Sequence, residues 1–247
     1  MRMQRTRFFK RRTNNGLLNE KNKRQVGYNM IGAVIAMQSE ADILLKEMQI
    51  YRSLTVSGKN IHVGKAYGKD VAVCVCGVGK VNAALGAQLL VSKFDAKKLL
   101  NFGVAGGLNQ DTQLCAVYQI GEAVQFDFDL VQLNGTKIGT LNEYEENYLK
   151  LNGLKLNIPT KKLGTADRFN DSETDFKLLT EELKADIRDM EGAAIVQAAY
   201  AAELPVYSIK AISDVAGSGS TTEQFLVNKN KALENLQAVL PTVFQEL

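Results

Sequence analysis

Three carboxylates are spaced so that they could perform acid–base chemistry on one substrate. Glu40 and Asp214 each follow an apolar segment, and Glu191 ends the run Asp-Met-Glu. Open α/β sheets bind ligands just beyond the carboxyl ends of their strands, so we expect the three side chains to meet at that edge. Carboxyl groups in different environments serve as general acid, general base or hydroxyl ligand.

Each carboxylate also has a structural explanation. Glu40 falls in a first helical turn, where the helix dipole favours negative charge, and Asp189 is a candidate N-cap for the helix that begins near Glu191. Asp214 is the strongest functional candidate, because an acid at the end of a buried strand is costly unless it is partnered or used. Lys210, in the same strand, is the natural cationic partner for one of the acids.

Two glycine-rich turns and one aromatic residue could line a ligand site. The turn at 77–80, Gly-Val-Gly-Lys, is too short for a phosphate-binding P-loop. The turn at 103–107, Gly-Val-Ala-Gly-Gly, allows a flat ligand to approach the backbone closely. Phe169 could stack on such a ligand, although an isolated Phe more often belongs to a core.

The sequence offers little for metal or triad chemistry. His62 is the only histidine, and the three cysteines contain no Cys-x-x-Cys pair. We therefore expect no metal and no cofactor.

Short apolar runs alternate with amphipathic stretches, which predicts an α/β fold of three layers, a central mixed β-sheet flanked by helices. In the least regular stretch, 127–160, Asn134-Gly135 marks a turn and Asn152-Gly153 a helix end, and we expect a hairpin followed by a short helix. The predicted strands are 30–36, 61–67, 70–76, 98–104, 117–125, 161–166, 185–190 and 205–213. The predicted helices are 39–49, 80–93, 142–151, 173–183, 191–203 and 222–246.

The chain divides into a basic tail, 1–27, and one domain, 28–247. The tail holds nine of the 30 basic residues and a single acid, which leaves the domain with 21 basic and 26 acidic residues. Such a domain is not expected to bind nucleic acid. The tail is expected to be disordered or outside the core. It could be a nucleic-acid or membrane-surface arm, an organellar presequence, or a non-native or mis-assigned start, and the strand-like run after Met30 favours the last.

No apolar run is long enough to cross a bilayer, and the N-terminus lacks the apolar region of a secretory signal. We therefore expect no membrane association and a cytoplasmic location.

Seven ordered segments between about residue 30 and the C-terminus resemble the 5'-methylthioadenosine/S-adenosylhomocysteine nucleosidases of the purine nucleoside phosphorylase superfamily. Seven matches in order are far more specific than any one of them. The segments are IGAVIAMQSE, GVGKVNAALGAQLL, NFGVAGGL, a reduced EAVQFDFD, TADRF, DMEGAAI and KAISDVAG.

The resemblance implies hydrolysis of the N-glycosidic bond of methylthioadenosine or S-adenosylhomocysteine, with release of adenine. It implies that Glu40 is the water-positioning base, that Glu191 binds the ribose hydroxyls and that Asp214 protonates purine N7. Lys210 takes the place of a family arginine that steadies the ribose-binding glutamate. The expected substrate-binding residues are Ala105, Gly106, Phe169, Asn170, Asp189, Met190 and Ser213. The family's nucleoside phosphorylase-like fold and homodimer are expected as well.

Departures from the family pattern lie where specificity is decided. Val104 replaces a small polar residue, Asn170 an aliphatic residue and Asp189 a glutamate, and the segment after Asp129 is short. Two alternatives stay open, a phosphate-dependent nucleoside phosphorylase and a non-catalytic nucleoside-binding protein. The negative charge of Glu40 would repel phosphate, which favours the hydrolase over the phosphorylase.

Overall fold

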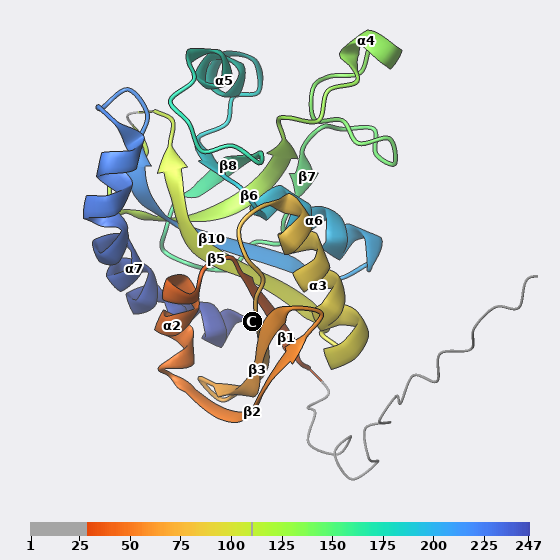
Figure 1. Ribbon diagram of the computed structural model, residues 1–247, viewed down its shortest axis with the longest axis vertical. Helices are drawn as coiled ribbons and strands as arrows, with labels where there is room; N and C mark the ends of the chain where they lie inside the picture. Colours follow the sequence, from red (N-terminus) through yellow and green to blue (C-terminus); the bar gives the residue numbers. More distant parts are fainter. Residues whose placement is uncertain (1–28, 110) are drawn as a thin grey trace, which may run out of the picture.

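The computed structural model describes residues 29–109 and 111–247. The basic tail expected over 1–27 lies outside the described residues. The rest forms a mixed sheet with helices packed on both sides (Figure 1). This is the α/β architecture that the alternation of apolar and amphipathic segments predicts.

The strands form one ten-stranded sheet, most of it in the order β10-β6-β8-β9-β5-β1-β4-β3-β2, with β7 paired to β6. Their bounds are β1 Ile31–Ile35, β2 Met48–Val56, β3 Lys59–Ala66, β4 Lys69–Val75, β5 Lys98–Gly107, β6 Val117–Gln125, β7 Leu149–Lys150, β8 Thr160–Thr165, β9 Ile187–Asp189 and β10 Val206–Val215.

The helices lie in two layers. Helices α2 and α7 pack together on one side of the sheet, and α3 and α6 pack together on the other (Figure 1). Their bounds are α2 Gln38–Leu45, α3 Lys80–Phe94, α4 Val131–Asn134, α5 Glu173–Lys177, the π-helical segment η1 Leu178–Glu182, α6 Gly192–Ala201 and α7 Thr221–Glu246.

Strand β10 closes part of the sheet on itself, because it pairs with β6 on one edge and in parallel with β5 on the other. The β5–β10 register slips between Ile212 and Asp214, which makes a bulge at Ser213. A bulge redirects the side chains next to it. Here it lies beside a cavity that both Ser213 and Asp214 line.

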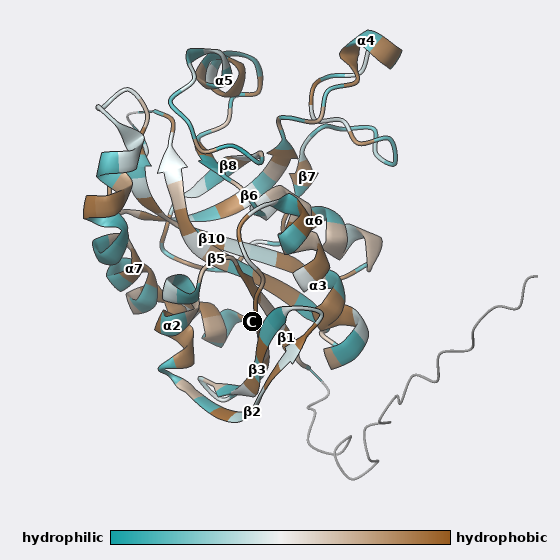
Figure 2. Cartoon of the chain, viewed as in Figure 1, coloured by the Kyte–Doolittle hydropathy of each residue, from teal (hydrophilic) through white to brown (hydrophobic). Residues whose placement is uncertain are grey.

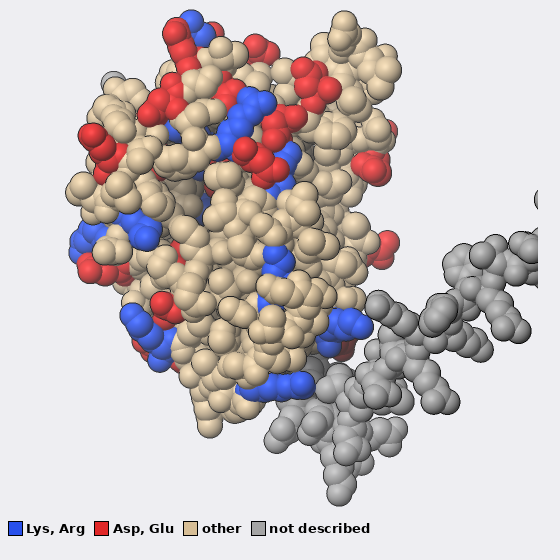
Figure 3. All heavy atoms as spheres, viewed as in Figure 1, with Lys and Arg blue, Asp and Glu red and all other residues tan. Residues whose placement is uncertain are grey.

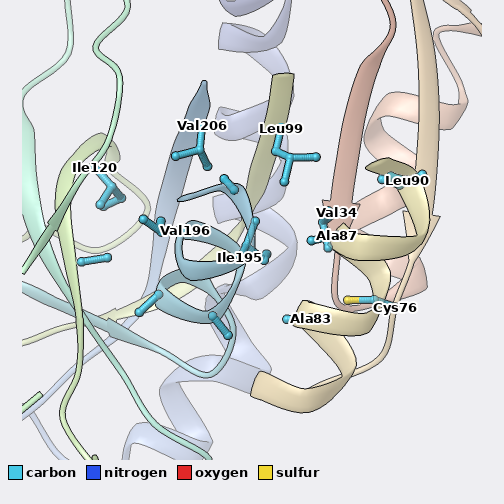
Figure 4. Packing of buried hydrophobic residues seen from close by; sticks show 14 of the residues in the cluster. Val34, Cys76, Ala83, Ala87, Leu90, Leu99, Ile120, Ile195, Val196 and Val206 are labelled. Atoms are coloured by element: carbon cyan, nitrogen blue, oxygen red, sulfur yellow. The ribbon is translucent and has the colours of Figure 1, made fainter. Parts of the chain in front are cut away.

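The largest core cluster joins the sheet to small-residue faces of α3 and α6 (Figure 4). Gly86 of α3 lies so close to the sheet that a Cβ there would be 2.8 Å from Cys76 Cβ. The buried strands are apolar, while α7 shows many polar residues on the surface in view (Figure 2). Residues of this cluster include Val34, Ala83, Ala87, Leu99, Ile195 and Val196.

Predictions for secondary structure are wrong in two regions. The predicted helix 142–151 is a series of turns that ends in β7. The ring of Tyr144 packs edge-to-face on Tyr200, the Tyr148 hydroxyl donates to the carbonyl of Leu183, and Leu149 pairs with β6. These contacts with three separate elements override the helical spacing of the apolar residues. The hairpin expected before this helix is also absent from the described residues, which form the short helix α4 at 131–134 and then turns up to β7.

The second region follows β1. The predicted helix 39–49 is too long, and strand β2 is not predicted at all. Helix α2 ends at Leu45, and β2 pairs antiparallel with β3 through a turn at Ser57 and Gly58. Most β2 side chains are exposed, so the segment lacks the apolar run that marked the other strands.

On the face shown in Figure 3, lysines and arginines are interspersed with acids rather than gathered in one patch. Within the described residues, no helix combines the length and apolar character needed to cross a membrane.

Candidate active site

A cavity of about 390 Å³ lies where β1, β5 and β10 end and where α6 begins. Its walls include the three carboxylates singled out from the sequence, Glu40, Glu191 and Asp214. All three side chains are buried. The size suits a small-molecule ligand, and the position is the one expected for an open α/β sheet.

Glu40 is held rigidly by two backbone groups. The N–H of Val104 donates to its Oε1 (2.8 Å) and the N–H of Met37 to its Oε2 (3.0 Å). A Cβ at position 103 would lie 2.4 Å from Oε1, so only glycine leaves room for the carboxylate. Burial raises the pKa of Glu40, an effect that the positive charge of Lys210 and the two N–H groups oppose.

Glu191 is held by the glycine turn before α3. The N–H of Gly79 donates to Glu191 Oε1 at 2.8 Å. Gly79 has φ +101°, a conformation that other residues rarely adopt. Burial and the nearby charge of Asp189 raise the pKa of Glu191 to about 7, while Lys210 and the Gly79 N–H act in the opposite direction.

Asp214 presents one free oxygen to the cavity. Its Oδ1 accepts a hydrogen bond from the Ser213 hydroxyl (2.7 Å), whereas its buried Oδ2 has no hydrogen-bond partner in the described part of the chain. Burial raises the pKa of Asp214, although the Ser213 hydrogen bond and the charge of Arg188 lower it. A buried carboxyl with a raised pKa and a free oxygen is suited to donate a proton.

Asp189 and Lys210 form a buried ion pair behind Glu191. Lys210 Nζ lies 2.8 Å from Asp189 Oδ2, while Asp189 Oδ1 accepts a hydrogen bond from the Thr165 hydroxyl (2.6 Å). The N–H of Gly192 also donates to Asp189, which caps the start of α6. Asp189 is therefore an anchor for the turn that carries Glu191, and its oxygens are already occupied.

The acids divide the cavity into two ends along β5. Glu40 contacts Gly103, and Asp214 contacts Gly106, three residues further along the strand. That separation corresponds to about 10 Å along β5. Phe169, half exposed and edge-to-face with Phe225 at 5.8 Å, and Met190 add apolar walls. The site can hold a planar group at the Asp214 end and a polar group between Glu40 and Glu191.

Comparison with known proteins identifies the family. The phosphorylase superfamily model matches residues 30–245. The chain belongs to the phosphorylase superfamily. Within it, a 5'-methylthioadenosine/S-adenosylhomocysteine nucleosidase of Haemophilus ducreyi is 31% identical over 211 residues, which are 79% of this chain and 90% of that relative.

Two further relatives come from the same superfamily. An aminodeoxyfutalosine nucleosidase of Campylobacter jejuni is 27% identical, and the alignment covers 81% of this chain and 93% of the relative. The solved structure of a methylthioadenosine/S-adenosylhomocysteine nucleosidase from Colwellia psychrerythraea, in complex with adenine, has a TM-score of 0.80 and 28% identity, with 88% of this chain and 96% of that chain covered. The expected family, fold and class of enzyme, a nucleosidase, are confirmed.

The structure brings most of the residues predicted for the site of this superfamily member to one cavity. Asn170 is not among them, since its side chain donates to Asp175 (3.1 Å). Lys210 lies behind the wall and pairs with Asp189 rather than with Glu191. The predicted residues that line the cavity are Glu40, Ala105, Gly106, Phe169, Asp189, Met190, Glu191, Ser213 and Asp214.

Sequence reasoning missed several residues of the wall. Met37 and Val78 come from the turns before α2 and α3, and Phe225 comes from α7. Arg188 also lines the cavity, two residues before Met190. A signal in the sequence could have identified Arg188: it lies in a short predicted strand, directly before the acids Asp189 and Glu191. Outside the cavity, His62 lies on β3 with its Nδ1 2.9 Å from the Ser53 hydroxyl.

The described residues contain no group of three His, Cys, Asp or Glu side chains arranged to hold a metal ion.

Proposed function

We propose that this chain hydrolyses the N-glycosidic bond of 5'-methylthioadenosine or S-adenosylhomocysteine and releases adenine. The observation that carries the proposal is the free Oδ2 of Asp214 in a cavity whose other end holds Glu40 and Glu191. Cleavage of a C1'–N9 bond makes the sugar more positive and the purine more negative. An acid at the base and carboxylates at the sugar stabilise both changes.

Each carboxylate has a separate role in this mechanism. Asp214, held by the Ser213 hydroxyl, gives its proton to N7 of the purine. Glu40, fixed by two N–H groups, orients the water that attacks C1' and accepts its proton. Glu191 binds the ribose hydroxyls, beside the thioether of Met190. Phe169 lies across the base.

Water is favoured over phosphate as the nucleophile because three nearby cations are already paired with carboxylates. Lys80 binds Asp127 (2.5 Å), and Arg168 binds Asp175 (2.7 Å). Lys210 is held by Asp189 behind the cavity wall. Arg188, which also lines the cavity, lies beside Asp214 at the end assigned to the base and not beside Glu40 at the sugar end. A phosphorylase needs free cationic donors beside C1'.

The decisive experiment is release of free purine from methylthioadenosine and S-adenosylhomocysteine, with and without phosphate. We expect adenine release at equal rates in both buffers. A strict requirement for phosphate would establish a phosphorylase instead. Binding of these nucleosides without any turnover would establish a non-catalytic protein.

The homodimer is also part of the proposal. Val81 and Leu85 lie one turn apart on α3 and are more than half exposed, and Val78, just before this helix, is also exposed. An apolar stripe of this kind is typical of a subunit interface. Sedimentation equilibrium should give about twice the monomer mass, and Leu85→Glu should lower it.

A further inference from the structure

Arg188 is a buried cation that the protein itself leaves unsatisfied. It lies on β9 with its side chain 11% exposed, and its Nη2 has no hydrogen-bond partner among the residues that the structure describes. Its ion pair within that part of the chain is long, 4.0 Å to Asp171 Oδ1. Buried guanidinium groups are normally hydrogen-bonded, so an unsatisfied one in a cavity wall points to a ligand atom.

Arg188 and Asp214 face the same small space above Gly106. A Cβ at position 106 would lie 2.8 Å from Asp214 Oδ2 and 3.2 Å from Arg188 Nε. Both residues line the cavity, yet no direct hydrogen bond joins them. The unpaired Oδ2 of Asp214 and the guanidinium group of Arg188, through its Nε, therefore lie side by side at the end of the cavity assigned to the base.

The chemistry of a purine decides what these two groups can recognise together. N7 and the substituent at C6 lie on the same edge of the ring, so a group beside the N7 donor meets that substituent. An amino group at C6 offers hydrogens, whereas a carbonyl offers lone pairs. Arginine has five N–H donors and no acceptor. It can therefore donate a hydrogen bond to a carbonyl at C6, but it forms none with an amino group at C6.

We propose that the cavity also takes purine nucleosides with a carbonyl group at C6, and that Arg188 donates a hydrogen bond to this oxygen. The inference rests on the proposed function and extends its substrate class from 6-aminopurines to 6-oxopurines.

The reaction is the same hydrolysis with a different leaving group. The C1'–N9 bond breaks with its electron pair moving to the purine, and a C1'–O bond forms to water. Asp214 supplies the proton that N7 receives, and Glu40 accepts the proton that water loses. The products are the free sugar and neutral hypoxanthine, and no other reactant is needed.

The test uses two substrates that differ only at C6, 5'-methylthioadenosine and 5'-methylthioinosine, with the full chain. We expect the wild type to cleave both, with kcat/KM for methylthioinosine at least about tenfold higher, the discrimination that one charge-assisted hydrogen bond provides. Arg188→Met should lower the ratio of methylthioinosine to methylthioadenosine kcat/KM about 10- to 100-fold. Arg188→Gln should lower this ratio too, because the amide oxygen of glutamine can accept a hydrogen bond from the C6 amino group of methylthioadenosine.

Arg168→Met is the matched control, because Arg168 lines the same cavity but is paired with Asp175. It should leave the ratio unchanged, and thermal unfolding should show that all variants fold. A wild type that cleaves methylthioadenosine but not methylthioinosine overturns this inference and leaves the proposed function standing. An equal effect of Arg188→Met on both substrates also overturns it.

If neither nucleoside is cleaved, the proposed function fails, and calorimetric binding of the free bases tests Arg188 separately. A preference for hypoxanthine over adenine that Arg188→Met abolishes supports the recognition of a 6-carbonyl group. Equal binding of the two bases by the wild type rules it out.

Discussion

Lys210 Nζ lies 2.8 Å from Asp189 Oδ2, and the two side chains are 3% and 2% exposed. Both residues depart from the pattern of the nucleosidases that the sequence resembles. Lys210 stands in place of an arginine, and Asp189 in place of a glutamate. In the structure, the two substituted residues form an ion pair with each other. Lys210 reaches Glu191 through its charge, which lowers the pKa of that carboxyl, and not through a hydrogen bond.

Lys210→Met should be strongly destabilising, because it leaves Asp189 buried without a counter-charge. Removal of one partner of a buried pair costs about 3–5 kcal/mol of unfolding free energy. Denaturant unfolding measures the loss. Lys97→Met is the matched control, since Lys97 pairs with Asp95 at the surface and should change stability by less than about 1 kcal/mol. Equal effects of the two substitutions would mean that the buried pair does not stabilise the fold.

Asp214→Asn should abolish most of the hydrolysis while the nucleoside still binds. An asparagine cannot give a proton to N7, and general acid catalysis contributes about 10²–10⁴-fold. Ser213→Ala removes the hydrogen bond to Asp214 Oδ1, together with a longer one to the carbonyl of Ala105 (3.3 Å), and should cost about tenfold. Rates of adenine release and the affinity for a slowly cleaved nucleoside measure the two effects. A loss below tenfold for Asp214→Asn would exclude Asp214 as the acid.

Gly103→Ala should lower kcat by moving Glu40. The added methyl group would lie 2.4 Å from Glu40 Oε1, so the carboxylate must leave the Val104 N–H. A displacement of about 1 Å of a catalytic group costs about 10²-fold. The control is Gly153→Ala, where a Cβ meets no atom within 4 Å. A normal kcat in Gly103→Ala would show that the position of Glu40 does not matter.

The carboxylates could be predicted from sequence because each one ends or follows a local pattern. Buried strands read as apolar runs, and the acids stand at their ends: Glu40 follows β1 after a short turn, and Asp214 is the second-last residue of β10. The missed features depend on contacts between distant segments. The partner of Lys210 and the unsatisfied state of Arg188 are set by how β9, β5 and β10 meet, which no local pattern encodes.

The same reasoning explains the errors in secondary structure. The spacing of apolar residues in 142–151 is helical, but Tyr144 and Tyr148 are bound by separate elements and Leu149 pairs with β6. Strand β2 was missed because its pairing with β3, and not burial, makes it a strand. A pattern based on burial finds the core strands and fails at the edge of the sheet.

The raised pKa of Glu191 predicts a specific dependence of stability on pH. Burial and Asp189 raise this pKa from its ordinary value of 4.5 to about 7, so the folded state favours the protonated carboxyl. This contribution is complete below about pH 4.5 and is lost as the pH rises through about 7. The unfolding free energy should therefore fall by roughly 3 kcal/mol across this window because of Glu191 alone.

Glu191→Gln removes that contribution, because the amide does not ionise. Glu40 and Asp214 also have raised pKa values and add a fall of the same sign, so the quantity to compare is the difference between variant and wild type. Denaturant unfolding between pH 5 and pH 8 measures this difference. The unfolding free energy of Glu191→Gln should rise relative to that of the wild type as the pH increases. Glu173→Gln, at an exposed position on α5, is the control, and its curve of unfolding free energy against pH should run parallel to that of the wild type. Parallel curves for Glu191→Gln as well would mean that the pKa of Glu191 is not raised by folding, and that the carboxyl already carries its charge in the empty site.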